Sequence, residues 1–191
     1  VEVFGLRLGS AALDAAEAVF GAAEGLAVFE SEAGERSLEA YFGTVQFGPL
    51  KAKVVARLVA SDAEMQALIE AASKRDGSPT GDWKYPLSAA NAAAQHSRVL
   101  AGLTYIPTYG GLEADFFRAR FGEPAAWHYA GETAVAWYYP DLGLTLVINS
   151  KDKEVLEYQP PRDFVVPDTV TWTASRDGGD TPGKAAAGPA D

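Results

Sequence analysis

The sequence predicts an α+β protein made of two related units, each a helix followed by an antiparallel β-meander, with the helices packed on one face of the sheet. Three observations predict this class. A window at residues 9–21 recurs at residues 110–122, alternating strand-like runs follow each window, and the connectors between these runs are short and rich in turn-forming residues. Aligned without gaps, the windows share five positions: Gly9/Gly110, Asp14/Asp115, Ala18/Ala119, Phe20/Phe121 and Gly21/Gly122.

The first window has the features of a short amphipathic helix. Leu13, Ala16 and Phe20 recur at helical spacing, which places them on one side of a helix. Ser10 is expected as the N-cap, because its hydroxyl can accept a hydrogen bond from the first helical turn. Gly21 suits the left-handed backbone conformation that commonly follows a helix.

Three strands are predicted after this helix, at residues 26–30, 37–42 and 51–59. In the second run Leu38, Ala40 and Phe42 alternate with polar or larger residues, and in the third the apolar set is Ala52, Val54, Ala56 and Leu58. The other face of the third run carries Lys51, Lys53, Val55 and Arg57. A turn signal at residues 47–49, Phe-Gly-Pro, predicts that the second and third strands pair as a hairpin.

The clearest helix signal begins at Ser61. Ser61 and Glu64 form a capping-box pattern, in which each side chain accepts a hydrogen bond from the other residue's backbone N–H. An apolar stripe follows at Met65, Leu68, Ile69 and Ala72. Lys74 and Arg75 are expected to complement the negative end of the helix dipole. The Gly- and Pro-containing stretch at residues 76–81 is the expected seam between the two units.

The second half repeats the order of helix and strands. A short helix at residues 88–95 and a strand at residues 99–106 come first, and a helix at residues 112–121 then ends before Gly122 and Pro124. Four further strands are predicted at residues 127–130, 133–139, 144–149 and 155–158. Their connectors are too short for parallel crossovers and therefore favour a meander.

These elements predict three segments. The first helix-and-sheet unit occupies residues 1–76, the second occupies residues 77–160, and a Pro-, Gly- and Ala-rich tail extends over residues 161–191. The last part of this tail, residues 181–191, has the composition of a segment that is disordered in isolation.

Composition excludes several function classes. The chain has 191 residues and a formal net charge of −10, and its longest basic run is Lys74-Arg75, which argues against nucleic acid as a partner. The absence of cysteine excludes disulfides, thiolate metal ligands and thiol nucleophiles. No transmembrane segment is expected, because no apolar run approaches ~18 residues. The first residue is Val1, which is compatible with removal of a leader peptide or with a lipid anchor before residue 1.

The motif order resembles a superfamily of small bacterial envelope modules, typified by the SmpA/OmlA outer-membrane assembly lipoprotein and the β-lactamase inhibitor protein. Residues 6–10, Leu-Arg-Leu-Gly-Ser, resemble the entry motif of that family, and Phe20-Gly21 and residues 121–124, Phe-Gly-Glu-Pro, resemble its helix exit. The resemblance implies a tandem α+β protein of the periplasm or cell envelope that works by binding other proteins. It transfers no catalytic residues, because the family has no catalytic motif.

Catalytic and metal-binding patterns are weak. His96 and His128 lie in different halves without the spacing of a metal site, so ordinary surface or sheet positions are expected for both. Glu113 and Asp115 stand at a predicted helix start, where the dipole alone explains negative charge. Gly110 and Gly111 precede the same helix and are expected to form a tight turn. No metal or cofactor is predicted.

The candidate binding residues are two pairs of aromatic side chains, Trp127 with Tyr129 and Trp137 with Tyr139. Within each pair the two side chains alternate along one strand, so both share one sheet face. If the strands align, four rings line one surface. Two interpretations stay open: the rings are core beneath the helix at residues 112–121, or they form an exposed platform while Ala134 and Ala136 lie under that helix.

The sequence therefore predicts a non-enzymatic protein that binds or scaffolds another envelope protein through a sheet face. One alternative is a small-molecule or lipid-binding module with an aromatic-lined cavity between helix and sheet. The least favoured alternative is a hydrolase that uses His128 with a nearby acid.

Overall fold

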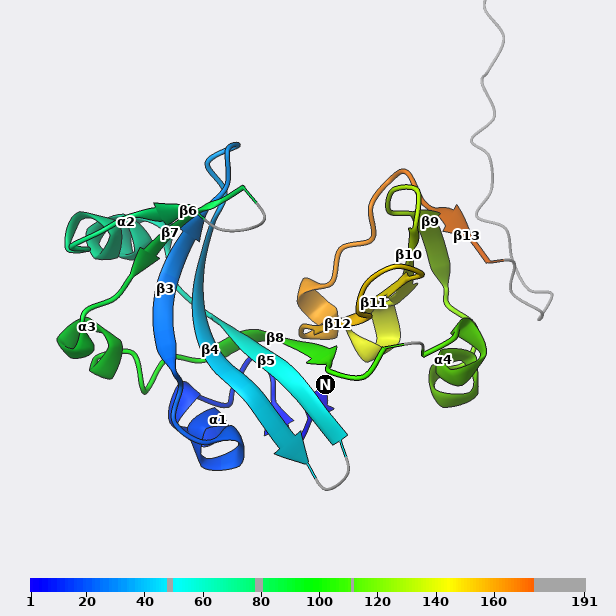
Figure 1. The fold of residues 1–191 in the computed structure, drawn as a ribbon, viewed down its shortest axis with the longest axis horizontal. Coiled ribbons are helices and arrows are strands. Elements are labelled where there is room, and N and C mark those ends of the chain that lie inside the picture. The colour runs from blue at the N-terminus through cyan, green and yellow to red at the C-terminus, as the bar shows by residue number, and fades with distance from the viewer. Residues whose placement is uncertain (48–49, 78–80, 111, 174–191) are drawn as a thin grey trace, which may run out of the picture.

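The computed structural model describes residues 1–47, 50–77, 81–110 and 112–173. It confirms the α+β class: a large antiparallel sheet carries the helices (Figure 1). The strands of the described ranges are β1 (Glu2–Val3), β2 (Leu6–Arg7), β3 (Gly25–Glu30), β4 (Arg36–Phe47), β5 (Leu50–Leu58), β6 (Asp76–Gly77), β7 (Trp83–Pro86), β8 (Leu100–Pro107), β9 (Ala126–Tyr129), β10 (Ala134–Tyr139), β11 (Leu144–Asn149), β12 (Val155–Tyr158) and β13 (Thr171–Trp172). The helices there are α1 (Leu13–Phe20), α2 (Asp62–Glu70), α3 (Ala89–Ala93) and α4 (Ala114–Phe121), with 3-10 turns η1 (Pro140–Leu142) and η2 (Pro161–Asp163).

Eleven of the strands form one continuous antiparallel sheet, in the order β13-β9-β10-β11-β12-β8-β5-β4-β3-β7-β6. The hairpin predicted from β4 and β5 and the meander predicted from β9 to β12 are both present. The residues of the predicted turn at 48–49 lie outside the described ranges. β8 is the middle strand of this order. It pairs with β5 on one side and with β12 on the other.

The sheet has two different faces. One row of cross-strand partners runs Trp127, Trp137, Leu146, Leu156, Tyr105 and Val54, and we call its side the helix face. The alternate row runs Tyr138, Thr145, Glu157, Thr104, Val55 and Tyr41, and we call its side the open face. The helix-face row belongs to one buried core cluster that also contains Leu13 of α1, Met65 of α2 and Phe117 of α4. The described helices therefore cover one side of the sheet.

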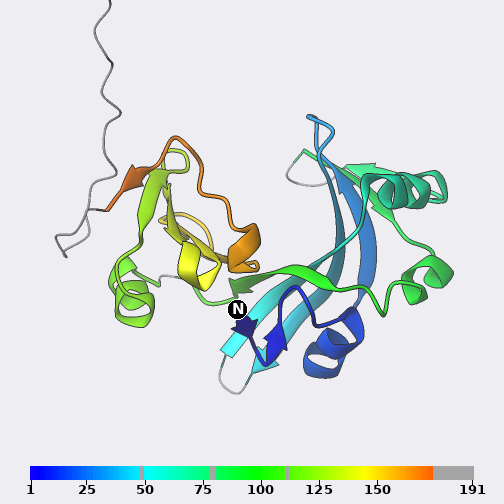
Figure 2. The same ribbon diagram turned by 180° about the vertical axis from the view of Figure 1, so that it is seen from behind.

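Figure 1 shows how the covering elements are distributed. Helices α1, α2 and α3 gather beside the N-terminal strands, whereas α4 lies at the other end of the molecule. Between them the β1–β2 hairpin lies beside β8 (Figure 2), where Phe4 contacts Tyr105 with ring centroids 5.4 Å apart and the Gly9 N–H donates to the Leu100 carbonyl. This small hairpin is absent from the sequence-based prediction.

The sheet pairing crosses the seam expected at residues 76–81. β7 pairs with β3, and β8 pairs with β5, so strands from the segment 77–160 complete the sheet of the segment 1–76. Residues 78–80 of the seam lie outside the described ranges. The pairing does not test the boundary itself, and the division at residue 76 stays a prediction.

The predicted N-cap residue of the first helix is wrong. The helix itself lies where it was predicted and ends before Gly21, as expected. α1 begins at Leu13, its N-cap residue is Ala12, and the Ser10 hydroxyl instead donates to the Arg7 carbonyl at 3.2 Å. The first helical N–H groups, those of Leu13 and Asp14, donate to the carbonyls of Arg98 and His96, both at 2.9 Å. Gly21 follows the helix with φ of 91°, a conformation that glycine adopts without strain.

The capping box predicted at Ser61 is confirmed. The Glu64 N–H donates to the Ser61 hydroxyl at 3.3 Å, and the Ser61 N–H donates to the Glu64 carboxylate at 2.8 Å. The predicted role of Lys74 and Arg75 at the helix end is wrong, because α2 ends at Glu70. Lys74 instead forms an ion pair with Asp76, and the Arg75 guanidinium lies 3.9 Å from the centre of the Trp83 ring.

The first residues of the predicted tail are part of the fold. β13 pairs with β9, and Phe164, Val166 and Val170 pack against Ala126, Ala136 and Tyr138 on the open face. This segment covers the β9–β10 end of the open face and leaves the middle of that face uncovered by it. Residues 181–191, for which disorder was predicted, lie outside the described ranges.

Within the described ranges, every helix is too short or too polar to pass through a lipid bilayer.

Candidate functional site

The two side chains of each candidate aromatic pair share one face of the sheet, as the alternation predicts, and for both pairs that face is the helix face. Trp127 is directly opposite Trp137 in the β9–β10 register, and Tyr129 is opposite Val135. Their exposure differs widely, however. Only 5% of Trp137 and 5% of Tyr139 is accessible to solvent, whereas Trp127 is half-buried and Tyr129 is 75% exposed. The structure therefore divides the predicted platform into two core rings, one intermediate ring and one surface ring.

Helix α4 covers the two buried rings. The Arg118 guanidinium lies 4.7 Å from the centre of the Trp137 ring, and Phe121 packs against Tyr139 with ring centroids 5.9 Å apart. The Tyr139 hydroxyl donates to the Gly122 carbonyl at 3.0 Å. Burial raises the pKa of the Tyr139 phenol to about 12, and the Glu123 carboxylate adds to this shift while Arg118 opposes it.

The interpretation that the rings belong to the core beneath the helix therefore holds for Trp137 and Tyr139. The other arrangement, with Ala136 beneath the helix, is wrong: Ala136 packs on the opposite side of the sheet with Ala126 and Tyr138. Strand alternation alone could not decide between the two faces, because both carry large residues. Ala136 and Tyr138 are buried by the segment that contains Phe164, and sequence reasoning treated that segment as a tail.

The two histidines have partners of different kinds. His96 Nδ1 lies 2.6 Å from a carboxylate oxygen of Glu17, which links α1 to the segment after α3. His128 stacks on Tyr138, and its Nδ1 lies 3.2 Å from the Tyr138 hydroxyl oxygen. The described residues contain no group of three or more His, Cys, Asp or Glu side chains arranged to hold a metal ion.

The middle of the open face is the second candidate site. Cross-strand partners place Glu39 beside Arg57, and Glu157 beside Thr104. These residues line a groove with Val55, Thr145 and Gln159. Tyr41, which lies opposite Val55 at the β4 end of the same row, is 39% exposed. A mixed polar, charged and aromatic surface thus spans β4, β5, β8 and β12.

A glycine, Gly102, leaves room for Arg57 in this groove. The open-face neighbour of Arg57 on β8 is Gly102. A Cβ atom at Gly102 would lie 3.3 Å from Arg57 Nη2 and 2.9 Å from the Tyr158 carbonyl oxygen. Because that position is empty, the guanidinium can lie across β8, and Arg57 Nη2 donates to Gln159 Oε1 at 3.0 Å. The side chain thereby bridges the two halves of the sheet.

The groove and its charged side chains alter the pKa of Glu157. Desolvation in the groove raises the pKa of the Glu157 carboxyl, although part of that side chain remains exposed, and the Arg57 guanidinium partly offsets the shift. Glu39, the second carboxylate of the groove, raises the pKa of Glu157 further. Two carboxylates and a guanidinium therefore interact across three strands.

Part of this site was visible in the sequence. The alternation at residues 51–59 placed Lys53, Val55 and Arg57 on one side of a strand, and that side is the open face. The contributions of Gly102, Thr104 and Glu157 were not predicted, because they depend on the pairing of β8 with β5 and β12. Local sequence carries no signal for that pairing.

Comparisons with protein-family models, with curated proteins and with solved structures found no match to this chain. The resemblance to the SmpA/OmlA and β-lactamase-inhibitor modules therefore stays a prediction.

Proposed function

We propose that this protein binds another protein through the middle of its open face. The observation that carries the proposal is the arrangement of the sheet: the helices and the β1–β2 hairpin bury one side, and the residues facing the other side between β4 and β12 remain accessible. These accessible residues come from four neighbouring strands, β4, β5, β8 and β12, and a partner protein can contact them together.

The side chains of the open face support a protein partner. Tyr and Arg are the residue types that most often dominate binding energy at protein interfaces, and Tyr41 and Arg57 lie on adjacent strands here. Glu39, Glu157 and Lys53 surround them with both signs of charge. Mixed charges of this kind favour specificity for a partner whose charges are complementary.

The finer architecture that we propose is a tandem repeat. α1 and α4 are both followed by a Phe-Gly step with positive φ at the glycine, and β3 and β9 begin at the same distance after their helices. β3, β4, β5 and β8 then correspond in sheet order to β9, β10, β11 and β12. In this proposal the first copy extends beyond residue 76 to include β8, and the segment between β5 and β8 is an insertion in that copy.

The proposed role is non-enzymatic and belongs to the bacterial cell envelope. Support for the location is the resemblance of the entry and Phe-Gly motifs to envelope modules. Support for binding rather than catalysis is the same resemblance together with the open face.

The test is a binding experiment with a matched pair of double variants. Tyr41→Ala with Arg57→Glu changes the open face, and Phe116→Ala with Arg120→Glu makes the same types of change on the exposed side of α4. Each purified protein is used to capture partners from an envelope extract of the organism that makes it. We expect the open-face variant to bind a captured partner at least ~10-fold more weakly, as loss of two central contacts predicts.

The α4 variant should retain the partner with unchanged affinity. Circular dichroism confirms that both variants are folded. Equal retention by the two variants, or loss in the α4 variant alone, contradicts the proposed face.

A further inference from the structure

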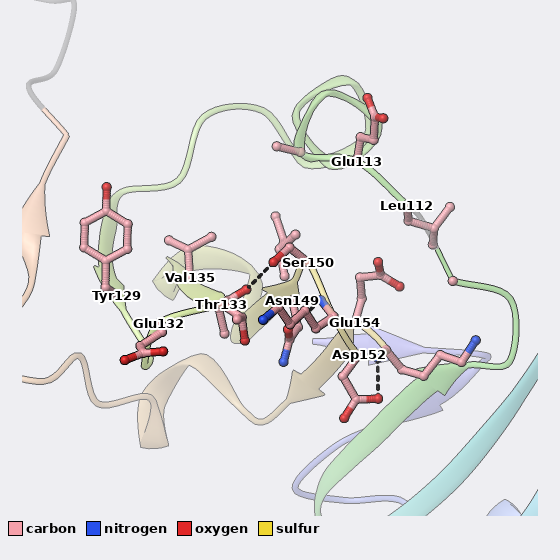
Figure 3. Close-up of a pocket in the computed structure, with 16 residues that line it drawn as sticks. Leu112, Glu113, Tyr129, Glu132, Thr133, Val135, Asn149, Ser150, Asp152 and Glu154 are labelled. Atoms are coloured by element: carbon pink, nitrogen blue, oxygen red, sulfur yellow. Dashed lines mark hydrogen bonds between the residues drawn. The ribbon is translucent and has the colours of Figure 1, made fainter.

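A groove of about 800 Å³ lies at the end of the second meander, away from the open face (Figure 3). One wall is formed by Leu112, Glu113 and the start of α4, and the other by the ends of the β9–β10 and β11–β12 connections. In Figure 3 Tyr129 stands at the opposite end of the groove from Leu112. The volume is within the range of small-molecule sites in proteins.

Three polar residues at the base of this groove already have partners. Ser150 donates both its N–H and its hydroxyl to the Thr133 carbonyl, at 2.9 and 3.2 Å. The Asp152 carboxylate accepts the Lys153 N–H at 2.7 Å, and the Lys153 ammonium donates to the Thr108 carbonyl at 2.6 Å. The two connections are thereby held in a fixed arrangement.

Glu154 differs from these residues because it is buried without such a partner among the described residues. It is only 2% exposed, and within the described ranges its Oε2 atom has no hydrogen-bond partner. None of the ion pairs found between described residues includes this side chain. Its carboxylate points into the space below Leu112 and Glu113 in Figure 3. A buried carboxylate without a partner is costly, so the position favours a cation that can supply one.

The surroundings favour a positive charge as well. Glu113, Glu132, Asp152 and Glu154 line the groove together with two lysines, so carboxylates outnumber ammonium groups there. A metal ion fits poorly, because the described residues provide no cluster of three or more metal-binding side chains, and Ca²⁺ takes about 6–8 oxygen ligands.

The walls favour an organic cation. Leu112, Val135 and Ile148 are half-buried apolar side chains of the lining, and the exposed ring of Tyr129 adds an aromatic surface. These side chains can pack along an aliphatic chain, while Glu154 accepts charge-assisted hydrogen bonds from an ammonium head group.

We propose that this groove binds a small organic cation, a primary ammonium group on a short aliphatic chain, with Glu154 as its counter-ion. The site is separate from the open face. It requires neither the open face nor a protein partner.

The probe that tests the site is n-hexylammonium chloride, with 1-hexanol as its neutral counterpart of similar size. Isothermal titration calorimetry on the full chain should give one hexylammonium site with a dissociation constant on the order of 1 mM or below. Hexanol should bind at least ~10-fold more weakly, because it cannot pair with the carboxylate. Equal affinity for hexylammonium and hexanol, or no binding of hexylammonium, overturns the proposal without any variant.

Two isosteric variants complete the test. Glu154→Gln removes the charge in the groove and should weaken hexylammonium binding at least ~10-fold while hexanol binding is unchanged. Glu70→Gln makes the same change on α2, outside the groove, and should leave both affinities as in the wild type. An unchanged hexylammonium affinity in Glu154→Gln, or the same loss in both variants, overturns the assignment of Glu154.

Discussion

Trp137 and Tyr129 lie on the same face of adjacent strands, yet only one of these two rings meets solvent. The difference comes from α4, whose residues Phe117, Arg118 and Phe121 cover the Trp137 end of the face and stop short of Tyr129. Sequence alternation predicted correctly that the side chains share a face. It could not predict how far along the strands the helix extends.

Substitution of Trp137 should therefore affect stability rather than a binding surface. Trp137→Ala is expected to lower the free energy of unfolding by about 3–5 kcal/mol, because it removes a large buried ring and leaves a cavity. Tyr129→Ala, at an exposed position, should change it by no more than about 0.5 kcal/mol. Urea denaturation followed by circular dichroism measures both values. Equal destabilisation by the two substitutions contradicts the burial seen here.

Among the elements, α2 and α1 show which helix ends can be predicted. The cap of α2 is local, because Ser61 and Glu64 satisfy each other's backbone N–H groups, and the sequence pattern identified it correctly. The cap of α1 is tertiary. Ala12 forms a β-bridge with Val99, and the first helical N–H groups bind carbonyls of the segment before β8. No local pattern around Ser10 could reveal a partner so distant along the chain.

The α2 cap makes a prediction about acid stability. Hydrogen bonds from Arg98 and Ser61 lower the pKa of the Glu64 carboxyl to about 2 from its ordinary value of 4.5. A lowered pKa in the folded state means that this contribution to stability is complete above about pH 4.5 and is lost as the pH falls toward 2. The melting temperature of wild type should therefore fall between these pH values more steeply than that of Glu64→Gln.

Glu70→Gln removes one negative charge from the same helix and controls for net charge. Its melting temperature should depend on pH as that of wild type does. Parallel curves for wild type and Glu64→Gln would show that the capping box makes no pH-dependent contribution.

Ser61→Ala should lower the free energy of unfolding at neutral pH by about 1 kcal/mol, because it removes the acceptor of the Glu64 N–H.

At the scale of the whole molecule, the pairing of β8 with β12 was the feature least accessible from sequence. Each meander is recognisable because its strands are consecutive and its connectors are short. The join between the halves depends on two strand edges that are far apart in the chain and remain free after each meander has formed. The same join determines the open face, since Arg57, Gly102 and Glu157 lie on three successive strands across it.

The continuous sheet predicts that the two halves unfold together. One core cluster contains Leu38 of β4, Val54 of β5, Tyr105 of β8, Leu156 of β12 and Trp137 of β10. A cavity made at one end of this cluster should therefore lower the stability reported from the other end. Leu38→Ala, at a fully buried position, is expected to lower the free energy of unfolding by about 2–5 kcal/mol.

Tryptophan fluorescence can report the second half alone. In a Trp83→Phe, Trp172→Phe background the remaining tryptophans are Trp127 and Trp137, both in the β9–β10 hairpin. Urea unfolding with and without Leu38→Ala should then show the fluorescence midpoint falling together with the midpoint measured by far-UV circular dichroism, as a two-state transition requires. A fluorescence midpoint that stays in place while the circular dichroism curve divides into two steps would mean that the β8–β12 pairing does not couple the halves. In that case the open face would be assembled from two independently stable parts.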